Sequence, residues 1–290
     1  MRSVVVTGAS TGIGRATVAA LVRTGHHVWA TVRRDLDARS LREQHGASVT
    51  PLIMDLEDDA TVAAAGEQVR AAGPLHGLVN NAGAALTGPL EFLPLAVFRR
   101  QLDINLVGQL SVTQAMLPAL HQAATRARSE GSRPPRIVMI GSIGGRIAGP
   151  MVGPYHASKF GIVGLSDSLR AELAPFGIGV VVIEPGSVAT PIWERALRSA
   201  NEVVAAMPPE ARRYERQVRT SFADAERTAA RGIPPERLAA VIVDALSGRN
   251  PRPRRLVGRD ARIVGILTRL LPPRLIYRMT ASREATGTPD

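Results

Sequence analysis

The chain has 290 residues, of which 36 are basic and 25 acidic, so its formal net charge at neutral pH is +11. It has no cysteine, which excludes disulfides, cysteine-ligated metal ions and thiol catalysis, and its apolar stretches are too short for a membrane-spanning helix. Its arginines are scattered without interleaved aromatic residues, so we expect no nucleic-acid binding. The N-terminus enters an apolar segment that is too short for a signal-peptide core, and we expect a cytoplasmic protein.

Short apolar runs alternate with longer stretches of helical spacing over the first 190 residues. The predicted strands are Val4–Thr7, His27–Val32, Val49–Met54, Gly77–Asn80, Arg136–Ser142 and Gly179–Glu184. The predicted helices include Arg15–Arg23, Asp59–Ala71, Leu95–Gln122 and Tyr155–Ala174. Nearly continuous apolar strands that alternate with helices are typical of a parallel sheet covered on both faces. We therefore predict an α/β protein with a doubly wound, mainly parallel sheet (a Rossmann fold) in a single domain.

The pattern changes after Thr190. Residues 191–232 are charged and helix-prone, and we expect them to form a lid over the substrate. A helix at Pro235–Leu246 and an edge strand at Arg254–Val257 are predicted to follow. Together these segments complete a dinucleotide-binding catalytic domain at residues 1–258.

The last residues, 259–290, form a basic amphipathic extension with helical character. Its apolar face around Ile263–Leu271 is followed by a break at Pro272 and Pro273. Residues 259–280 could contact an anionic membrane surface, cover the edge of the sheet or form a subunit contact.

A glycine-rich turn, Thr7–Gly14, follows the first predicted strand and opens a helix. Glycines there permit a tight bend, close approach of the backbone to a pyrophosphate, and close packing of the helix on the sheet. The N–H groups at the start of the helix would hold the phosphates. The residues expected to bind are Gly8, Ser10, Thr11, Gly12, Ile13 and Gly14.

The end of the second strand indicates which dinucleotide binds. Proteins that bind NAD place an acidic residue about 20 residues after the glycines, where it bonds the ribose hydroxyls. Here that position is Val32, followed by Arg33 and Arg34, and a guanidinium can pair with a 2′-phosphate. Binding of NAD would require Asp35 or Asp37 to reach back to the ribose. We therefore predict NADP as the cofactor, with NAD as the alternative.

Tyr155 and Lys159 stand four residues apart in a predicted helix, on one face and within reach of a shared ligand. Lys159 is the only lysine among the 36 basic residues. An ammonium near a phenol lowers its pKa and makes tyrosine a usable acid and base near neutral pH. Ser142, at the end of the preceding strand, could hold a carbonyl or hydroxyl beside the phenol. The alternative is that Tyr155 begins a helix and Lys159 is a solvated surface charge.

These motifs, in this order and spacing, resemble the short-chain dehydrogenases/reductases. The match covers residues 3–190 and continues more loosely to Gly258, and it includes Thr-Gly-x-x-x-Gly-x-Gly and Tyr-x-x-x-Lys. The resemblance implies that Tyr155 is the general acid and base and that Ser142 orients the substrate. It also implies that Lys159 bonds the nicotinamide ribose and lowers the pKa of Tyr155, and that Asn105 holds a proton-relaying water. Implied cofactor contacts further along the chain are Asp55, Leu56, Asn81, Ala82, Gly83, Pro185, Gly186, Val188 and Thr190, beside Tyr155 and Lys159.

The segment VVVIEPGSVATPI at Val180–Ile192 is most similar to the hydroxysteroid and retinol dehydrogenase subgroup. This likeness implies hydride transfer between a lipophilic secondary alcohol and its ketone. The expected substrate contacts are Ile143, Gly144, Met151, Val152 and Trp193. We expect a homodimer or homotetramer and no metal ion, since the six histidines lack ligand spacing. The alternative of a different class is a non-catalytic NAD(P)-binding regulatory or scaffold protein of the same fold.

Overall fold

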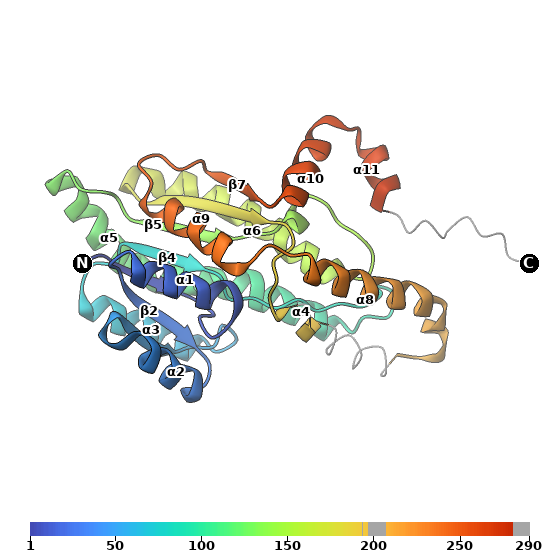
Figure 1. The fold of residues 1–290 in the computed structure, drawn as a ribbon, viewed down its shortest axis with the longest axis horizontal. Coiled ribbons are helices and arrows are strands. Elements are labelled where there is room, and N and C mark those ends of the chain that lie inside the picture. Colours follow the sequence, from blue (N-terminus) through green and yellow to red (C-terminus); the bar gives the residue numbers. More distant parts are fainter. Residues whose placement is uncertain (193, 197–206, 281–290) are drawn as a thin grey trace, which may run out of the picture.

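The structure is a computed structural model that describes residues 1–192, 194–196 and 207–280. In this part of the chain, seven parallel strands form one sheet in the order β3-β2-β1-β4-β5-β6-β7 (Figure 1). The strands are β1 Ser3–Val6, β2 His27–Val32, β3 Val49–Ile53, β4 Gly77–Asn80, β5 Arg136–Ile140, β6 Gly179–Pro185 and β7 Arg254–Val257. Because β3 and β4 lie on opposite sides of β1, the direction of winding reverses between β1 and β4. The predicted doubly wound Rossmann fold is confirmed.

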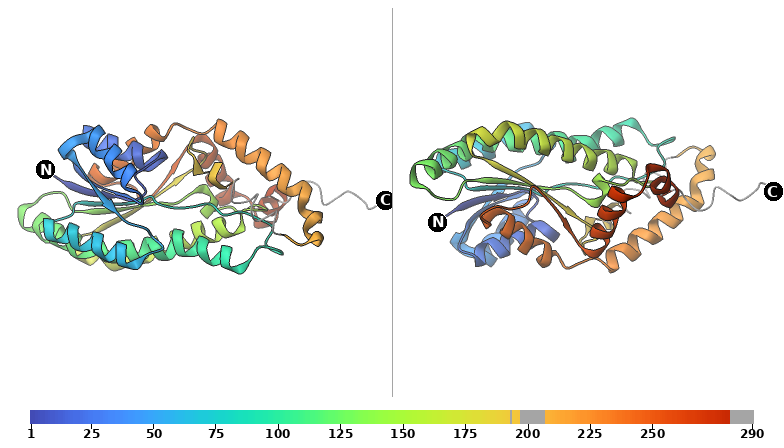
Figure 2. Two further views of the ribbon diagram at one scale, coloured as in Figure 1. Left: turned by 90° about the horizontal axis from the view of Figure 1, so that it is seen from below. Right: turned by 90° about the horizontal axis from the view of Figure 1, so that it is seen from above.

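The sheet lies between two layers of helices (Figure 2). The α-helices that the described residues form are α1 Gly12–Arg23, α2 Asp35–His45, α3 Asp59–Ala72, α4 Leu95–Leu102, α5 Gly108–Glu130, α6 Gly153–Leu173, α8 Glu215–Ala230, α9 Pro235–Ser247, α10 Arg259–Leu270 and α11 Pro273–Thr280. Side chains of α1, α2 and α9 pack on one face of the sheet, and those of α3, α5 and α6 pack on the other.

Burial on both faces explains the continuous apolar strands. Val4 and Val6 belong to the core on the α1 side, while Val5 belongs to the core on the α5 side. Successive side chains of a strand point to opposite faces, so a strand covered on both sides needs apolar residues at every position.

Two elements differ from the prediction. The helix predicted at Leu95–Gln122 is α4, a π-helical segment at Asp103–Val107, and α5, which continues to Glu130. Helix α2 was not predicted, because it buries little apolar surface and its periodicity is weak: Ala38 and Leu41 are its buried residues.

The C-terminal helices extend the fold beyond β7. Gly265 of α10 lies against Leu256 of β7, close enough that a Cβ at Gly265 would collide with the leucine side chain. Helix α11 packs on α10, and Figure 1 shows both at the end of the molecule where α8 lies. Among the described helices, none is both long and apolar enough to span a membrane. The boundary at residue 258 and the role of 191–232 as a lid stay predictions.

Candidate active site

A cavity of about 630 Å³ lies at the carboxyl ends of the central strands, where the winding reverses. It brings together most of the residues predicted from the sequence. These are Gly8, Ser10, Thr11, Gly12, Ile13, Arg33, Arg34, Asp55, Leu56, Asn81, Ala82, Gly83, Ser142, Tyr155, Lys159, Pro185, Gly186, Val188 and Thr190. The predicted motifs, from the glycine turn near the N-terminus to Thr190, therefore line one cavity.

The glycine turn has the shape that a pyrophosphate requires. Gly8 and Gly12 have φ angles of +65° and +54°, which residues with a Cβ rarely adopt. Helix α1 begins at Gly12, so its first N–H groups face this side of the cavity. Gly14 lies behind the cavity wall, where a Cβ would collide with the carbonyl oxygen of Gly8. The turn therefore fits a dinucleotide phosphate, and Gly14 allows α1 to pack closely on the turn.

Asn81 ties the turn after β1 to the end of β4. Its Nδ2 donates to Thr7 O at 2.8 Å, and its backbone N–H donates to Thr7 Oγ1 at 2.9 Å. Ala82 N–H donates to the same hydroxyl, also at 2.9 Å. The side-chain amide of Asn81 thus holds the protein's own backbone at the edge of the cavity.

The charged groups at the end of β2 are arranged in two pairs. Arg34 donates to both carboxylate oxygens of Asp37, at 2.8 and 3.0 Å. Asp37 also lines the cavity, so one of the two aspartates that NAD binding would require is near the site. Its carboxylate is already paired with Arg34. The side chain of Arg33 is 65% exposed and lies 4.0 Å from Asp55, a distance too long for a hydrogen bond. Arg33 is therefore able to take an anionic ligand.

Ser142, Tyr155 and Lys159 meet where β5 ends and α6 begins. The side chains of Ser142 and Tyr155 share a hydrogen bond, and Ser142 Oγ accepts another from Gly144 N–H at 3.0 Å. Lys159 Nζ donates to Ile140 O at 2.8 Å and lies 5.7 Å from the centre of the Tyr155 ring. Lys159 is only 8% exposed, which contradicts the alternative of a solvated surface charge.

The pKa of Tyr155 moves in the direction opposite to the predicted one. Burial raises the pKa of the phenol above its ordinary value of 10, and the hydrogen bond with Ser142 offsets part of this. Burial also lowers the pKa of Lys159 from 10.5 to about 8. The pKa of Tyr155 is raised rather than lowered because burial penalises the charged forms of both Tyr155 and Lys159. The Lys159 ammonium is also directed at the Ile140 carbonyl and not at the phenol oxygen.

Asn105 lies in the π-helical segment and is buried behind the cavity. Its Oδ1 accepts from Ala84 N–H at 2.8 Å, and its Nδ2 donates to Ala84 O at 2.9 Å and Ser158 Oγ at 3.0 Å. The Asn105 side chain therefore links the loop after β4 to α6, where its partner Ser158 directly precedes Lys159. Its implied role in holding a water stays a prediction.

The sequence profile of the family described as short chain dehydrogenase matches residues 2–201. The chain belongs to the short-chain dehydrogenase family. It is 30% identical over 285 residues to the NADPH-dependent 3-dehydrocapnine reductase of Ornithobacterium rhinotracheale, with 96% of both chains covered. It is 32% identical to retinol dehydrogenase 5 of Mus musculus, covering 94% of this chain and 86% of the relative. Among solved structures, a short-chain dehydrogenase from Streptomyces avermitilis shares the fold with a TM-score of 0.75 at 25% identity, covering 96% of each chain.

Of the substrate contacts predicted for this short-chain dehydrogenase, the four that the structure describes (Ile143, Gly144, Met151 and Val152) are not among the residues that line the cavity. Val152 packs on a small cluster formed by Ala85, Tyr155 and Ala196. Ile143 and Gly144 form the turn directly after Ser142, and Met151 is buried with a φ of +66°. Trp193 lies outside the described residues, as do residues 197–206 of the predicted lid.

Sequence reasoning missed several residues of the cavity wall in this short-chain dehydrogenase. They include Thr31, Ala85, Leu86, Ile104, Ile192 and Arg195. The apolar ones carry no local signal that distinguishes them from core residues. Arg195 Nη2 donates to Thr11 Oγ1 at 3.2 Å, across 184 residues of sequence. In the described residues, no group of three or more histidine, aspartate or glutamate side chains is arranged to hold a metal ion.

Proposed function

We propose that the chain is an NADP(H)-dependent oxidoreductase that interconverts a lipophilic secondary alcohol and its ketone by hydride transfer. One observation carries the proposal: a single cavity of about 630 Å³ contains the glycine turn, Arg33 and the Ser142–Tyr155–Lys159 group. It therefore combines an anion-binding region with a proton donor. The names of two relatives support this reading: one is an NADPH-dependent reductase, the other a retinol dehydrogenase.

The chain's own groups supply position and a proton. When bound, a nicotinamide cofactor supplies or accepts the hydride. The Ser142 hydroxyl, hydrogen-bonded to Tyr155, would hold the substrate oxygen beside the phenol. In reduction Tyr155 gives its proton to the carbonyl oxygen, and in oxidation it takes the proton of the alcohol. The hydrogen bond with Ser142 lowers the pKa of Tyr155 and so favours the phenolate that forms during reduction, against the burial that raises this pKa. Lys159, whose ammonium lies 5.7 Å from the ring centre, would add to this effect once the reaction places negative charge on the phenol.

The test of this mechanism is Tyr155→Phe. The binding of NADPH, followed by its fluorescence, should be retained, while turnover of a panel of hydrophobic ketones should fall by about 10²- to 10⁴-fold. Tyr277→Phe, on the exposed surface of α11, is the matched control and should change neither quantity. Retained turnover in Tyr155→Phe would refute the assigned proton donor. Wild-type protein that binds NADPH but oxidises it with none of the ketones would favour the non-catalytic alternative.

The preference for NADP rests on Arg33, since Arg34 is already paired with Asp37. Arg33→Ala should weaken NADPH binding at least tenfold and leave NADH binding within about twofold, because only NADPH carries the 2′-phosphate. Arg42→Ala removes an exposed arginine of α2 outside the cavity and is the control. Equal losses for both dinucleotides in Arg33→Ala would remove the argument for NADP.

The lipophilic substrate class rests on the apolar side chains of the cavity wall, Ala85, Leu86, Ile104 and Ile192, of which Ala85 and Ile192 pack in one cluster with Tyr155. Each methylene buried against such a wall contributes about 0.8 kcal/mol. In a series of methyl ketones, kcat/KM should therefore rise by up to about fourfold per added methylene until the chain outgrows the cavity. A flat or falling series would exclude an apolar subsite.

We also propose that α10 and α11 rest on an anionic lipid surface. Their exposed large apolar side chains are Ile263, Ile266, Leu270, Leu275 and Tyr277. Exposed arginines lie on the same helices at Arg259, Arg262, Arg269, Arg274 and Arg278. The one acid of these helices, Asp260, accepts a hydrogen bond from Ser187 N–H at 2.7 Å. An uncompensated positive surface repels a second copy of itself and attracts anionic lipid.

Sedimentation with vesicles tests this surface. The chain should bind vesicles of phosphatidylcholine with phosphatidylglycerol and bind pure phosphatidylcholine at least tenfold more weakly. Ile263→Ser combined with Ile266→Ser should abolish binding, whereas Leu36→Ser, at an exposed leucine of α2, should not. Equal binding to both vesicle types would refute the proposal. Self-association of the wild type that the double variant abolishes would also refute it, because the surface of α10 and α11 would then bind a second copy of the chain. The predicted homodimer or homotetramer stays a prediction.

A further inference from the structure

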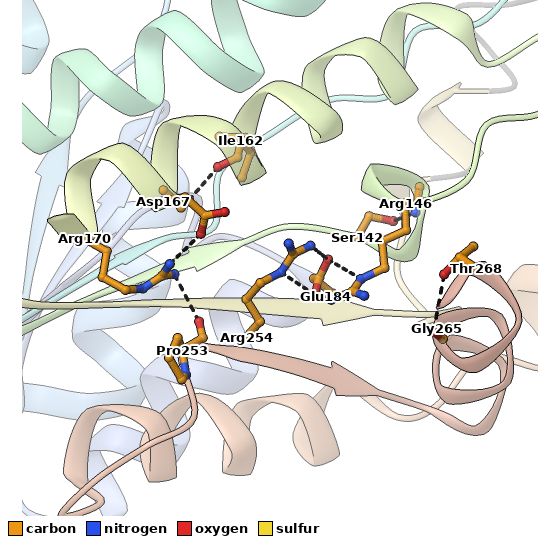
Figure 3. A network of polar contacts seen from close by, with 12 residues as sticks. Ser142, Arg146, Ile162, Asp167, Arg170, Glu184, Pro253, Arg254, Gly265 and Thr268 are labelled. Carbon is orange, nitrogen blue, oxygen red and sulfur yellow. Dashed lines mark hydrogen bonds and ion pairs between the residues drawn. The ribbon is translucent and has the colours of Figure 1, made fainter. Parts of the chain in front are cut away.

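A carboxylate is enclosed between two guanidinium groups beside the turn that carries Ser142 (Figure 3). Glu184 of β6 is 0% exposed. Arg146 donates to it through Nε at 2.9 Å and Nη2 at 2.7 Å, and Arg254 of β7 donates through Nη2 at 2.6 Å and Nε at 3.3 Å. Both carboxylate oxygens therefore receive a hydrogen bond from each arginine.

The group is charged in the folded state. Burial raises the pKa of Glu184, but the hydrogen bonds from Arg146 and Arg254 outweigh it and hold the pKa below the ordinary value. Taking such charges out of water is costly, and buried ion pairs are often replaceable by apolar residues without loss of stability. Stability alone therefore does not explain why three charges are placed here.

The position of Arg146 provides a different explanation. The turn from Gly141 to Arg146 is joined to β6 at both ends: Gly141 N–H donates to Ile183 O at 2.8 Å, and Arg146 binds Glu184. Between these anchors, Gly145 N–H donates to Ser142 O at 3.0 Å. Two successive residues of β6 thus hold the ends of the short turn that contains Ser142.

The opposite side of the turn is fixed by close packing. A Cβ at Gly145 would lie 2.6 Å from the carbonyl oxygen of Lys159, so the turn lies directly on α6. On this side the turn is also held by a hydrogen bond between Gly144 O and His156 Nδ1 of α6, at 2.9 Å. If the Arg146 anchor were released, this bond would hold only the middle of the turn, and the Ser142 hydroxyl would be less firmly placed beside Tyr155. Arg254 reaches the same carboxylate from β7 and has no part in the turn.

We propose that the Arg146–Glu184 ion pair is a positioning device that fixes Ser142 for catalysis, and that Arg254 only completes the enclosure of the carboxylate. The inference rests on the proposed reaction, in which Ser142 holds the substrate oxygen. Arg146 and Glu184 touch no reacting atom in it; they act through the turn.

Arg146→Met and Arg254→Met form a matched pair for the test. Each removes one guanidinium from the same carboxylate, and the two side chains are similarly exposed, at 26% and 31%. Both variants should lose similar thermal stability and bind NADPH like the wild type. In Arg146→Met, kcat should fall about 100-fold, since small misplacements of a catalytic group have effects of this size. In Arg254→Met, kcat should stay within about threefold of the wild type.

Two further variants separate positioning from a general structural role. Arg146→Lys keeps a positive charge that can pair with Glu184, so its kcat should be within about tenfold of the wild type. Recovery should be incomplete, because lysine cannot make the two parallel hydrogen bonds of the guanidinium. In a Ser142→Ala background, Arg146→Met should lower kcat by less than about threefold more, because residues that act as one unit are not additive. Equal losses of kcat in the two methionine variants, or full additivity with Ser142→Ala, would overturn the inference.

Hydrogen exchange gives a readout that does not need turnover. The amides of residues 143–146 should exchange at least tenfold faster in Arg146→Met and at the wild-type rate in Arg254→Met. Unchanged exchange in Arg146→Met would overturn the inference even if the wild type proved inactive. Absence of turnover in the wild type with the expected exchange pattern would instead refute the proposed reaction and leave the anchoring of the turn established.

Discussion

Replacing Lys159 by methionine should make the cofactor-free protein more stable at neutral pH while removing its turnover. Methionine has a similar length and volume but no charge, and the side chain is buried. The substitution thus separates what the ammonium does for the reaction from what it costs the fold.

The magnitude follows from the pKa. Burial lowers the pKa of Lys159 from 10.5 to about 8, which corresponds to about 3 kcal/mol at 1.36 kcal/mol per pH unit. The substitution also removes the hydrogen bond from Nζ to Ile140 O, a loss of about 1 kcal/mol. At pH 7 the variant should therefore exceed the wild type in free energy of unfolding by about 2 kcal/mol.

The pH dependence has a definite sign. Between pH 8 and 10.5 the unfolded wild type still holds a proton that the folded state has released. Stability rises with pH wherever the unfolded state binds more protons, so the wild type gains stability across this window. Lys159→Met lacks this group, and its advantage should disappear by about pH 10.

Urea unfolding of wild type and variant at pH 7, 8.5 and 10, without cofactor, measures the difference directly. Lys159→Arg is the contrasting variant: a guanidinium keeps its charge throughout this range and is larger, so it should be less stable than the wild type at every pH. Parallel stability profiles for wild type and Lys159→Met would show that burial does not penalise the ammonium, and would refute the reasoning.

Substitutions at four other positions test the scaffold. Gly14→Ala should lower stability by about 3 kcal/mol or more in urea unfolding and prevent NADPH binding, because the new methyl group collides with the Gly8 carbonyl. Gly164→Ala, where a Cβ meets open space in α6, should instead be neutral or stabilising by up to about 1 kcal/mol. The pKa of His76 is lowered, mainly by burial, from 6.5 to about 4, so stability should fall as the pH drops through that window. His76→Gln should flatten the profile by about 1 to 2 kcal/mol, less than the full pKa shift implies, because the ring is only half-buried and solvent screens its charge. Asp58→Ala removes the acceptor that caps α3 at the N-terminus and should cost about 1 kcal/mol in thermal unfolding, whereas Asp58→Asn should cost less.

The fold and the centre of the site could be predicted because their signals are local. An apolar strand such as β6 shows in its own residues that both of its faces are covered. The spacing of Tyr155 and Lys159 fixes them on one helix face wherever the helix lies. The glycine turn requires positive φ angles at Gly8 and Gly12. Glycine is strongly favoured at such positions, so the turn can be recognised from the sequence.

The remaining features depend on contacts between distant segments, which sequence spacing does not encode. Glu184 meets Arg146 and Arg254 across 38 and 70 residues, and no local pattern in the chain distinguishes these two arginines from the other 33. The direction of the Tyr155 pKa shift was predicted wrongly for the same reason, since it depends on how deeply the finished fold buries the phenol. The sequence alone therefore determined which chemical groups are present and which strands carry them, because helix and strand periodicity are local. The tertiary structure alone decided which charges pair, how the Ser142 turn is held and how burial shifts the pKa values, because desolvation and ion pairing arise only when separate elements pack together.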